Sequence, residues 1–284
     1  MTSQPPPADP LAADRLAVHV PEALSELRFA LPGGAHALFT DRSHGNLSLL
    51  SGPHHDRAHA ARERLRESLS LDALVAGPQV HGTTVQRVTA ESFDGLPADG
   101  RATSLRGVAM MVLAADCLPV ILVADRAVAA LHAGWRGLAA GVLEEGLAAV
   151  REMSVAGVEM SSAGVEMSSK TGARARVCAR PRVPAHARAR ARGVACESLV
   201  ALLGPCAGAC CYEVAPDVHR LFPEAPPRPD SHLDLRAIAR HRLLAAGVQR
   251  VEAADLCTIC DRRFFSHRRQ AAQAGRQAGI VWLP

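Results

Sequence analysis

The chain has 284 residues, 48% of them hydrophobic and 21% charged. A chain of this length forms one large domain or two small ones, and this composition excludes a disordered protein. No uncharged apolar run is long enough for a membrane span. The net charge of +4 comes from one stretch, 170–194, which holds eight basic residues and no acidic one. The rest is mildly acidic, so we expect no binding to nucleic acid or membranes.

The N-terminus and the cysteines indicate the compartment. The opening MTSQPPPADP has no basic region followed by an apolar one, so we expect a flexible tail over 1–25 and a cytoplasmic location. The chain has eight cysteines, which fit reduced thiols or metal ligands better than a disulfide framework.

Short apolar runs alternate with helical patterns along the chain. Runs bounded by turn residues predict buried strands at 108–114, 120–124, 127–131 and 199–203, with a closing strand at 280–283. Apolar spacing predicts helices at 137–150, 241–246 and 268–278. The predicted class is α+β.

One segment, at about 153–194, differs from this pattern. The heptapeptide AGVEMSS at 156–162 recurs unchanged at 163–169, and an Arg/Ala/Pro-rich stretch follows. Neither part has a core-forming periodicity, so we predict a disordered insertion within the domain. An arginine-rich arm for RNA or acidic lipid is the alternative, but it lacks interleaved aromatic residues.

Three segments place one metal-binding side chain each beside glycines or strand ends. These are GPQVHGTTV with His81, AADCLPV with Cys117, and LHAGWRG with His132. Such a set suits zinc or copper, and three protein ligands leave a fourth position open, as in catalytic sites. Each residue alone also fits an ordinary strand-end histidine or buried thiol. A cysteine hydrolase with Cys117 as nucleophile and His132 as base fits the same residues without a metal.

Residues next to these ligands are candidates for supporting roles. The helix that follows His132 could hold an anion at its N-terminus together with Arg136. Asp116 could orient a ligand histidine or cap a turn before Pro119.

A second group of cysteines lies further along the chain, in GPCAGACCYEV and DLCTIC. Its members are Cys206, Cys210, Cys211, Cys257 and Cys260. A four-thiolate zinc site is possible, although the first spacing is CxxxCC rather than CxxC. We favour packing thiols, with a redox dithiol at Cys257 and Cys260 as a third hypothesis.

Ordered motifs then carry a resemblance to a known family. PQVHGTTV, AADCLPVILVAD, AALHAGWRGLAAGVL, LGPCAGACCYEV and DLCTICDRRFFSHRR resemble the YfiH-type laccase-domain family, also described as multicopper polyphenol oxidases, purine nucleoside phosphorylases and peptidoglycan editing factors. The resemblance covers about residue 30 to 284, except for the insertion.

The resemblance implies a single α+β domain over 26–284, with mixed β-sheets sandwiched between helices. It implies a zinc ion held by His81, Cys117 and His132, with copper the less favoured metal. It also implies phosphorolysis of adenosine, inosine and S-methyl-5′-thioadenosine with phosphate, and deamination of adenosine. An enzyme that edits peptidoglycan precursors and a copper-dependent polyphenol oxidase are the alternatives. We expect a monomer.

Substrate-binding residues follow from chemistry and from the resemblance together. We expect Arg42 and Arg136 to bind phosphate, with Arg268 a weaker candidate. Asp116 and His267 could relay protons, although a structural hydrogen bond is the favoured role for both. The family's Thr-x-Arg-x-Gly-Gly segment is here Thr-Asp-Arg-Ser-His-Gly at 40–45, which keeps Arg42 but lacks one glycine.

Overall fold

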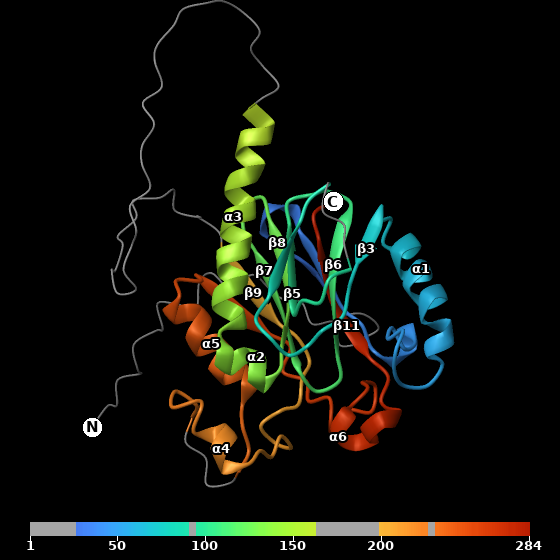
Figure 1. Ribbon diagram of the computed structural model, residues 1–284, viewed down its shortest axis with the longest axis vertical. Coiled ribbons are helices and arrows are strands. Elements are labelled where there is room, and N and C mark those ends of the chain that lie inside the picture. The colour runs from blue at the N-terminus through green and yellow to red at the C-terminus, as the bar shows by residue number, and fades with distance from the viewer. Residues whose placement is uncertain (1–26, 91–94, 163–198, 227–230) are drawn as a thin grey trace, which may run out of the picture.

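A computed structural model describes residues 27–90, 95–162, 199–226 and 231–284. Two mixed β-sheets pack face to face in the centre, and helices cover their outer faces (Figure 1). The predicted α+β class, with mixed sheets between helices, is confirmed. The expected tail at 1–25 lies outside the described residues, as does most of the expected insertion.

The first sheet has five strands in the order β1-β2-β11-β6-β3. The strands are β1 (Leu27–Ala30), β2 (His36–Phe39), β3 (Ala73–Val75), β6 (Val108–Ala114) and β11 (Gln277–Trp282). Strand β11 is antiparallel to both β2 and β6, and β3 is parallel to β6. The C-terminal strand β11 therefore lies between the N-terminal pair β1-β2 and strand β6 from the middle of the sequence.

The second sheet has six strands in the order β10-β9-β7-β8-β5-β4. They are β4 (Val85–Val88), β5 (Gly100–Thr103), β7 (Leu118–Val123), β8 (Val128–Ala133), β9 (Val200–Leu203) and β10 (Arg250–Ala253). Every residue of β7, β8 and β9 is buried, because this sheet is covered on both faces. Continuous apolar runs are what such doubly covered strands require.

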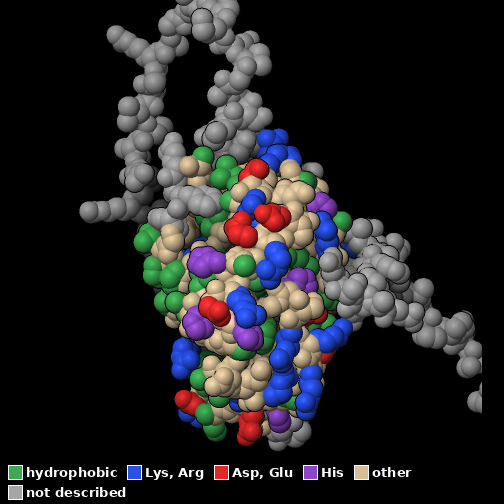
Figure 2. Space-filling model, turned by 90° about the vertical axis from the view of Figure 1, so that its right-hand side faces the viewer, with side chains coloured by type: hydrophobic (Ala, Val, Ile, Leu, Met, Phe, Trp, Pro, Cys, Tyr) green, Lys and Arg blue, Asp and Glu red, His purple; other side chains and the backbone are tan. Residues whose placement is uncertain are grey.

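The helices lie on both sides of the paired sheets. They are α1 (Ala58–Ser68), α2 (Trp135–Ala140), α3 (Val142–Ser162), α4 (Pro216–His219), α5 (Leu235–Ala245) and α6 (His267–Gln270). Figure 1 shows α2, α3 and α5 beside the six-stranded sheet and α1 on the opposite side. Figure 2 shows the face that carries α1, where basic side chains gather in the lower half.

Three apolar clusters correspond to these layers. The largest joins the six-stranded sheet to α3 and α5, a second fills the space between the sheets, and a third joins α1 to the five-stranded sheet. Burial of this much apolar surface is the main stabilising contribution to such a fold.

Several predicted elements match the structure and others differ. The strand at 108–114 is confirmed in full, and those at 120–124, 127–131, 199–203 and 280–283 overlap β7, β8, β9 and β11. The helix predicted at 241–246 is the second half of α5. The helix predicted at 137–150 is divided between α2 and α3, because Gly141 has a left-handed backbone with φ of 103°.

Two predictions are wrong. The helix expected at 268–278 ends at Gln270, and the segment from Gln277 is strand β11. The insertion does not begin at 153, because α3 continues to Ser162 and the side chains of Met153 and Ser154 are buried. None of the described helices is long and apolar enough to cross a membrane.

Candidate functional site

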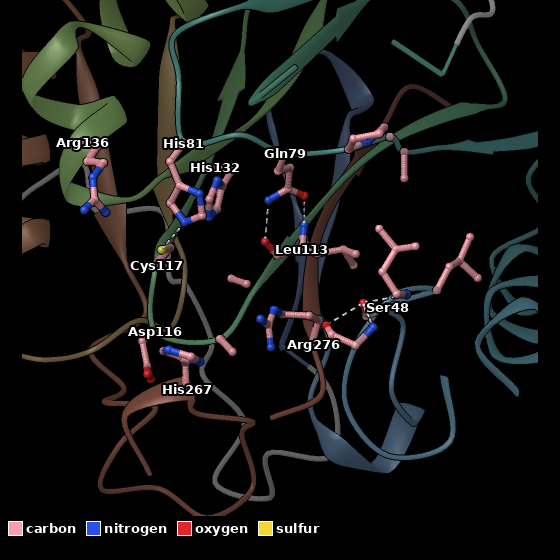
Figure 3. Close-up of a pocket in the computed structure, with 18 of the residues that line it drawn as sticks. Ser48, Gln79, His81, Leu113, Asp116, Cys117, His132, Arg136, His267 and Arg276 are labelled. Atoms are coloured by element: carbon pink, nitrogen blue, oxygen red, sulfur yellow. Dashed lines mark hydrogen bonds between the residues drawn. The ribbon is translucent and has the colours of Figure 1, made fainter. Parts of the chain in front are cut away.

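The three predicted metal ligands converge at one end of the six-stranded sheet. His81 lies in the loop between β3 and β4, Cys117 in the turn between β6 and β7, and His132 near the end of β8. A ligand atom from each lies within 4.8 Å of the other two, and His81 Nε2 is 3.9 Å from Cys117 Sγ. Figure 3 shows both imidazoles beside the thiol. Residues up to 51 positions apart in sequence thus form one cluster.

A fully buried carboxylate, Asp99, organises this cluster. Its Oδ1 accepts a hydrogen bond from His132 Nδ1 at 2.8 Å and one from the backbone N–H of His81 at 2.9 Å. Its Oδ2 accepts the N–H groups of Val80 and Gly82. A carboxylate on Nδ1 fixes the tautomer and leaves Nε2 of His132 for a metal. Sequence reasoning missed Asp99, because it belongs to none of the recognised motifs.

Backbone geometry around the ligands is unusual. His81 and Asp116 have positive φ values of 59° and 91°, although neither is a glycine. Such conformations persist only where the surroundings impose them, and they concentrate at functional sites. A Cβ at Gly134 would lie 3.0 Å from the His81 ring and 3.1 Å from Cys117 Sγ. Glycine at 134 therefore allows the three ligands to approach.

Electrostatics couple Cys117 to His132. Burial raises the pKa of the Cys117 thiol, but the charge of His132 and hydrogen bonds with both histidines outweigh it and lower this pKa to about 6. Burial lowers the pKa of His132, whereas the Cys117 thiolate and Asp99 raise it to about 9. Without a metal, each group thus favours the charged form of the other, the thiolate of Cys117 and the imidazolium of His132.

The ligands open onto a pocket of about 690 Å³. This volume lies in the range of small-molecule sites. One wall comes from the loop at 48–51, another from 76–79, and a third from the C-terminal segment with His267, Arg268 and Arg276. The Gln79 side chain holds its wall in place, because its amide donates to and accepts from the backbone of Leu113 at 2.8 and 2.7 Å.

Four arginines line the pocket, and they differ in how they are held. Arg62 donates a hydrogen bond to the carbonyl of Leu47. Arg276 donates hydrogen bonds to the carbonyls of Ala274 and Gly275. Arg136 lies over the Trp135 ring at 4.2 Å, and Arg268 over the Tyr212 ring at 4.9 Å. Within the described ranges, neither Arg136 nor Arg268 has a carboxylate within salt-bridge distance.

The other predicted substrate residues have different surroundings. Asp116 lines the pocket, but its carboxylate accepts hydrogen bonds from the Thr258 and Ser266 hydroxyls and from the backbone N–H of Arg268. The carboxylate that contacts a candidate ligand histidine is thus Asp99 and not Asp116.

His267 and Arg42 complete the set. His267 lines the pocket, and its Nδ1 donates to the Ala271 carbonyl at 3.1 Å, which leaves Nε2 available. Arg42 is not among the pocket-lining residues. It lies over the Phe265 ring at 5.0 Å, so the expectation that Arg42 binds phosphate has no support from the pocket.

The donor set fits a single divalent transition metal. Two imidazole nitrogens and one thiolate are ligands that zinc accepts, and three of them leave a coordination position facing the pocket. The carboxylate on His132 Nδ1 is the outer partner that such ligands usually have.

Comparison with known families agrees with these observations. The model of the multi-copper polyphenol oxidoreductase laccase family matches residues 33–167 and 170–284. The chain therefore belongs to this family, and the resemblance to its YfiH-type members is confirmed.

Individual proteins that are similar to this chain agree with the family match. A Xylella fastidiosa protein named purine nucleoside phosphorylase is 34% identical over 287 residues, covering 92% of each chain. Escherichia coli purine nucleoside phosphorylase YfiH is 30% identical over 84% of this chain and 86% of its own. The crystal structure of Neisseria meningitidis protein NMB0706 superposes with a TM-score of 0.65 at 30% identity, covering 91% of this chain and 98% of the other.

Proposed function

We propose that this protein is a zinc-dependent purine nucleoside phosphorylase that uses phosphate to cleave adenosine, inosine and S-methyl-5′-thioadenosine, with adenosine deamination as a side activity. The observation that carries the proposal is a three-ligand centre open to a pocket with two arginines that have no carboxylate partner among the described residues. The names of the relatives support the same activity.

His81, Cys117 and His132 would hold the metal. When bound, zinc supplies a Lewis acid at the pocket wall, the property on which deamination of adenosine would depend. A multicopper oxidase needs several copper sites rich in histidine. In the described part of the chain, the groups able to hold a metal are this centre and a cluster of four cysteines. This ligand supply favours a zinc centre at the pocket over a multicopper oxidase.

Phosphorolysis requires an anion site and a proton donor. A phosphate oxygen attacks C1′ of the ribose, the C1′–N9 bond breaks, and the electron pair stays on the purine, which takes up a proton. Arg136 and Arg268 suit the phosphate, because each guanidinium is fixed by an aromatic ring and has no acidic partner among the described residues. His267 Nε2 suits the proton transfer.

The test is an assay of zinc-loaded protein with adenosine and phosphate. We expect release of adenine and ribose 1-phosphate that depends on phosphate concentration. The Arg268→Gln variant should raise the KM for phosphate by roughly tenfold or more, the usual cost of losing a charged hydrogen bond. Arg42→Gln is the matched control, and its KM should stay unchanged. Fully zinc-loaded protein that releases no base would refute the proposal.

A cysteine hydrolase, with cell-wall precursors as substrates, is the second candidate. Cys117, His132 and Asp99 are arranged as nucleophile, base and orienting carboxylate, and the Cys117 pKa is lowered to about 6. The two candidates respond oppositely to metal. Removal of zinc abolishes the phosphorylase, whereas it activates a thiolate hydrolase and makes it sensitive to alkylation.

A further inference from the structure

Four cysteines outside the pocket centre form a second cluster. Cys210 and Cys211 lie in the loop between β9 and α4, and Cys257 and Cys260 lie in the loop after β10. Strands β9 and β10 are parallel neighbours, so their carboxyl ends meet at one edge of the sheet. An isolated parallel β-bridge between the backbones of Cys206 and Cys257 continues this strand pairing into both loops. Two cysteine pairs, 46 or more residues apart in sequence, are thereby placed side by side.

The sulfur atoms of this four-cysteine cluster are as close as the ligands of one ion. All four lie within 4.8 Å of one another, with 3.6 Å between Cys210 and Cys260 and 3.1 Å between Cys211 and Cys260. Four thiolates at the usual Zn–S length form a tetrahedron with edges of about 3.8 Å. Small side-chain shifts therefore suffice for coordination. A polynuclear iron–sulfur cluster would hold its thiolates further apart, with iron and sulfide between them.

The backbone around the cluster is arranged to support thiolates. The N–H of Gly208 donates to Cys257 Sγ at 3.2 Å. A Cβ at position 208 would lie 3.0 Å from Cys257 Cβ and 3.3 Å from Cys210 Sγ, so glycine permits this approach. A backbone donor aimed at sulfur stabilises the charged form, which is the form that binds a metal.

The neighbouring Cys206 shows what a packing thiol looks like in the same loop. It is fully buried, and its Sγ donates to the Ala207 carbonyl. Two members of the cluster, Cys210 and Cys260, are instead exposed. Burial of apolar surface therefore does not explain why four thiols meet there, and the packing hypothesis holds for Cys206 alone.

We propose that Cys210, Cys211, Cys257 and Cys260 together bind one zinc ion as a closed four-thiolate structural site, separate from the centre at His81, Cys117 and His132. Four protein ligands fill a tetrahedral ion, so this site has no open position for substrate. Its role is to join the loop after β9 to the loop after β10.

The two loops that the second zinc ion would join also contact the wall of the pocket. Tyr212, next to Cys211, lines the pocket and lies under Arg268. Thr258, between Cys257 and Cys260, donates to the Asp116 carboxylate at 2.7 Å. The second ion thus fixes the positions of Arg268 and of the turn that carries Cys117. Its loss should destabilise the fold and raise the KM for substrate.

The experiment measures zinc and free thiols in full-length protein purified under reducing conditions without chelators. Wild-type protein should hold roughly one zinc per site and thus two per chain. Cys260→Ser should lose one of them, and Cys117→Ala should lose the other. The matched control is Cys206→Ala, which removes a thiol from the same loop and should keep both. Because the variants address the two sites separately, failure of this proposal is distinct from failure of the proposed function.

A second measurement does not depend on how the Cys260→Ser variant folds. Cys117→Ala, which keeps all four cluster thiols, is exchanged with Co²⁺. We expect intense thiolate-to-cobalt charge-transfer bands and tetrahedral ligand-field bands, and X-ray absorption of the zinc form should show sulfur neighbours alone. Iron in place of zinc, a disulfide within the cluster of the freshly reduced protein, or a metal-free Cys117→Ala that gives no cobalt bands would each overturn the proposal.

Discussion

The two thiol-containing clusters lie close together in one domain and differ in ways that predict different roles. The pocket centre has three donors, two of them imidazoles, and faces a cavity of about 690 Å³. The four-cysteine cluster has four sulfurs between two loops. A tetrahedral ion held by three protein ligands keeps a position for chemistry, whereas one held by four does not. The number of donors thus separates a candidate catalytic site from a candidate structural one.

The outer partners of the two clusters differ as well. Asp99 orients the pocket centre with a carboxylate on His132 and on the backbone of His81. The four-cysteine cluster receives a backbone N–H from Gly208. A carboxylate raises the basicity of a ligand imidazole, while an N–H stabilises thiolate charge. Each partner suits the donor that it contacts.

The largest expected effect comes from removing the thiol of the pocket centre. Cys117→Ala leaves two imidazoles, so it should abolish zinc retention at this centre and both proposed activities while the fold stays intact. Metal analysis, circular dichroism and the adenosine–phosphate assay measure the three properties. If the variant kept the metal of this centre and normal phosphorolysis, the assignment of Cys117 would be wrong.

The second effect distinguishes the two buried carboxylates near the centre. Asp99→Asn should weaken zinc affinity by roughly 10- to 100-fold, because the amide no longer favours the required tautomer of His132. Asp116→Asn is the matched control. Its amide cannot satisfy all the donors from Thr258, Ser266 and Arg268, so it should lose about 1–3 kcal/mol of stability and keep its zinc affinity.

Chelator competition measures the zinc affinity of these two variants, and thermal unfolding measures their stability. Equal zinc affinity in both would mean that Asp99 does not orient His132. A weaker affinity in Asp116→Asn alone would restore Asp116 as the orienting group.

Alkylation of metal-stripped protein tests the electrostatics of the centre. The thiolate of Cys117 reacts, and its pKa is about 6. Because the pKa is lowered, the rate should be near its plateau at pH 7 and fall roughly tenfold for each pH unit well below 6. Burial raises the pKa of Cys206 to about 12, so this thiol is the internal control and should stay unmodified. Mass spectrometry of the labelled peptides gives both rates, and a Cys117 profile centred near pH 9 would contradict the ion pair with His132.

The sequence pointed to the three candidate ligands but not to Asp99, for a physical reason. His81, Cys117 and His132 lie beside glycines or at the ends of apolar runs, so local patterns marked them. Asp99 is brought to the histidines only by the pairing of β5 with β8, which no local pattern encodes. The same holds for the four-cysteine cluster, whose closeness depends on the parallel pairing of β9 with β10.

The strand at the C-terminus shows how tertiary pairing overrides a local pattern. Residues 268–278 have helical spacing, but β11 is held between β2 and β6 and begins at Gln277. The Gln277 side chain also bonds to the backbone of Phe265, which fixes where the strand starts. Long-range contacts of this kind decide the structure of short segments with weak intrinsic preference.

The smallest expected effect concerns residues 155–194, a segment in which the family match is interrupted at 168–169. The last described side chains of α3 that lie in the core are those of Met153 and Ser154, whereas Val155 is 61% exposed. A deletion of residues 155–194 keeps both buried side chains and the residues just before Leu199. Of the residues that the structure describes, it removes no candidate ligand of either cluster and no pocket-lining residue. Turnover should therefore stay within a few-fold of wild type, and zinc content should be unchanged. A shortened chain that fails to fold, or that folds but loses the zinc of the four-cysteine cluster, would show that this segment supports the domain rather than merely interrupting it.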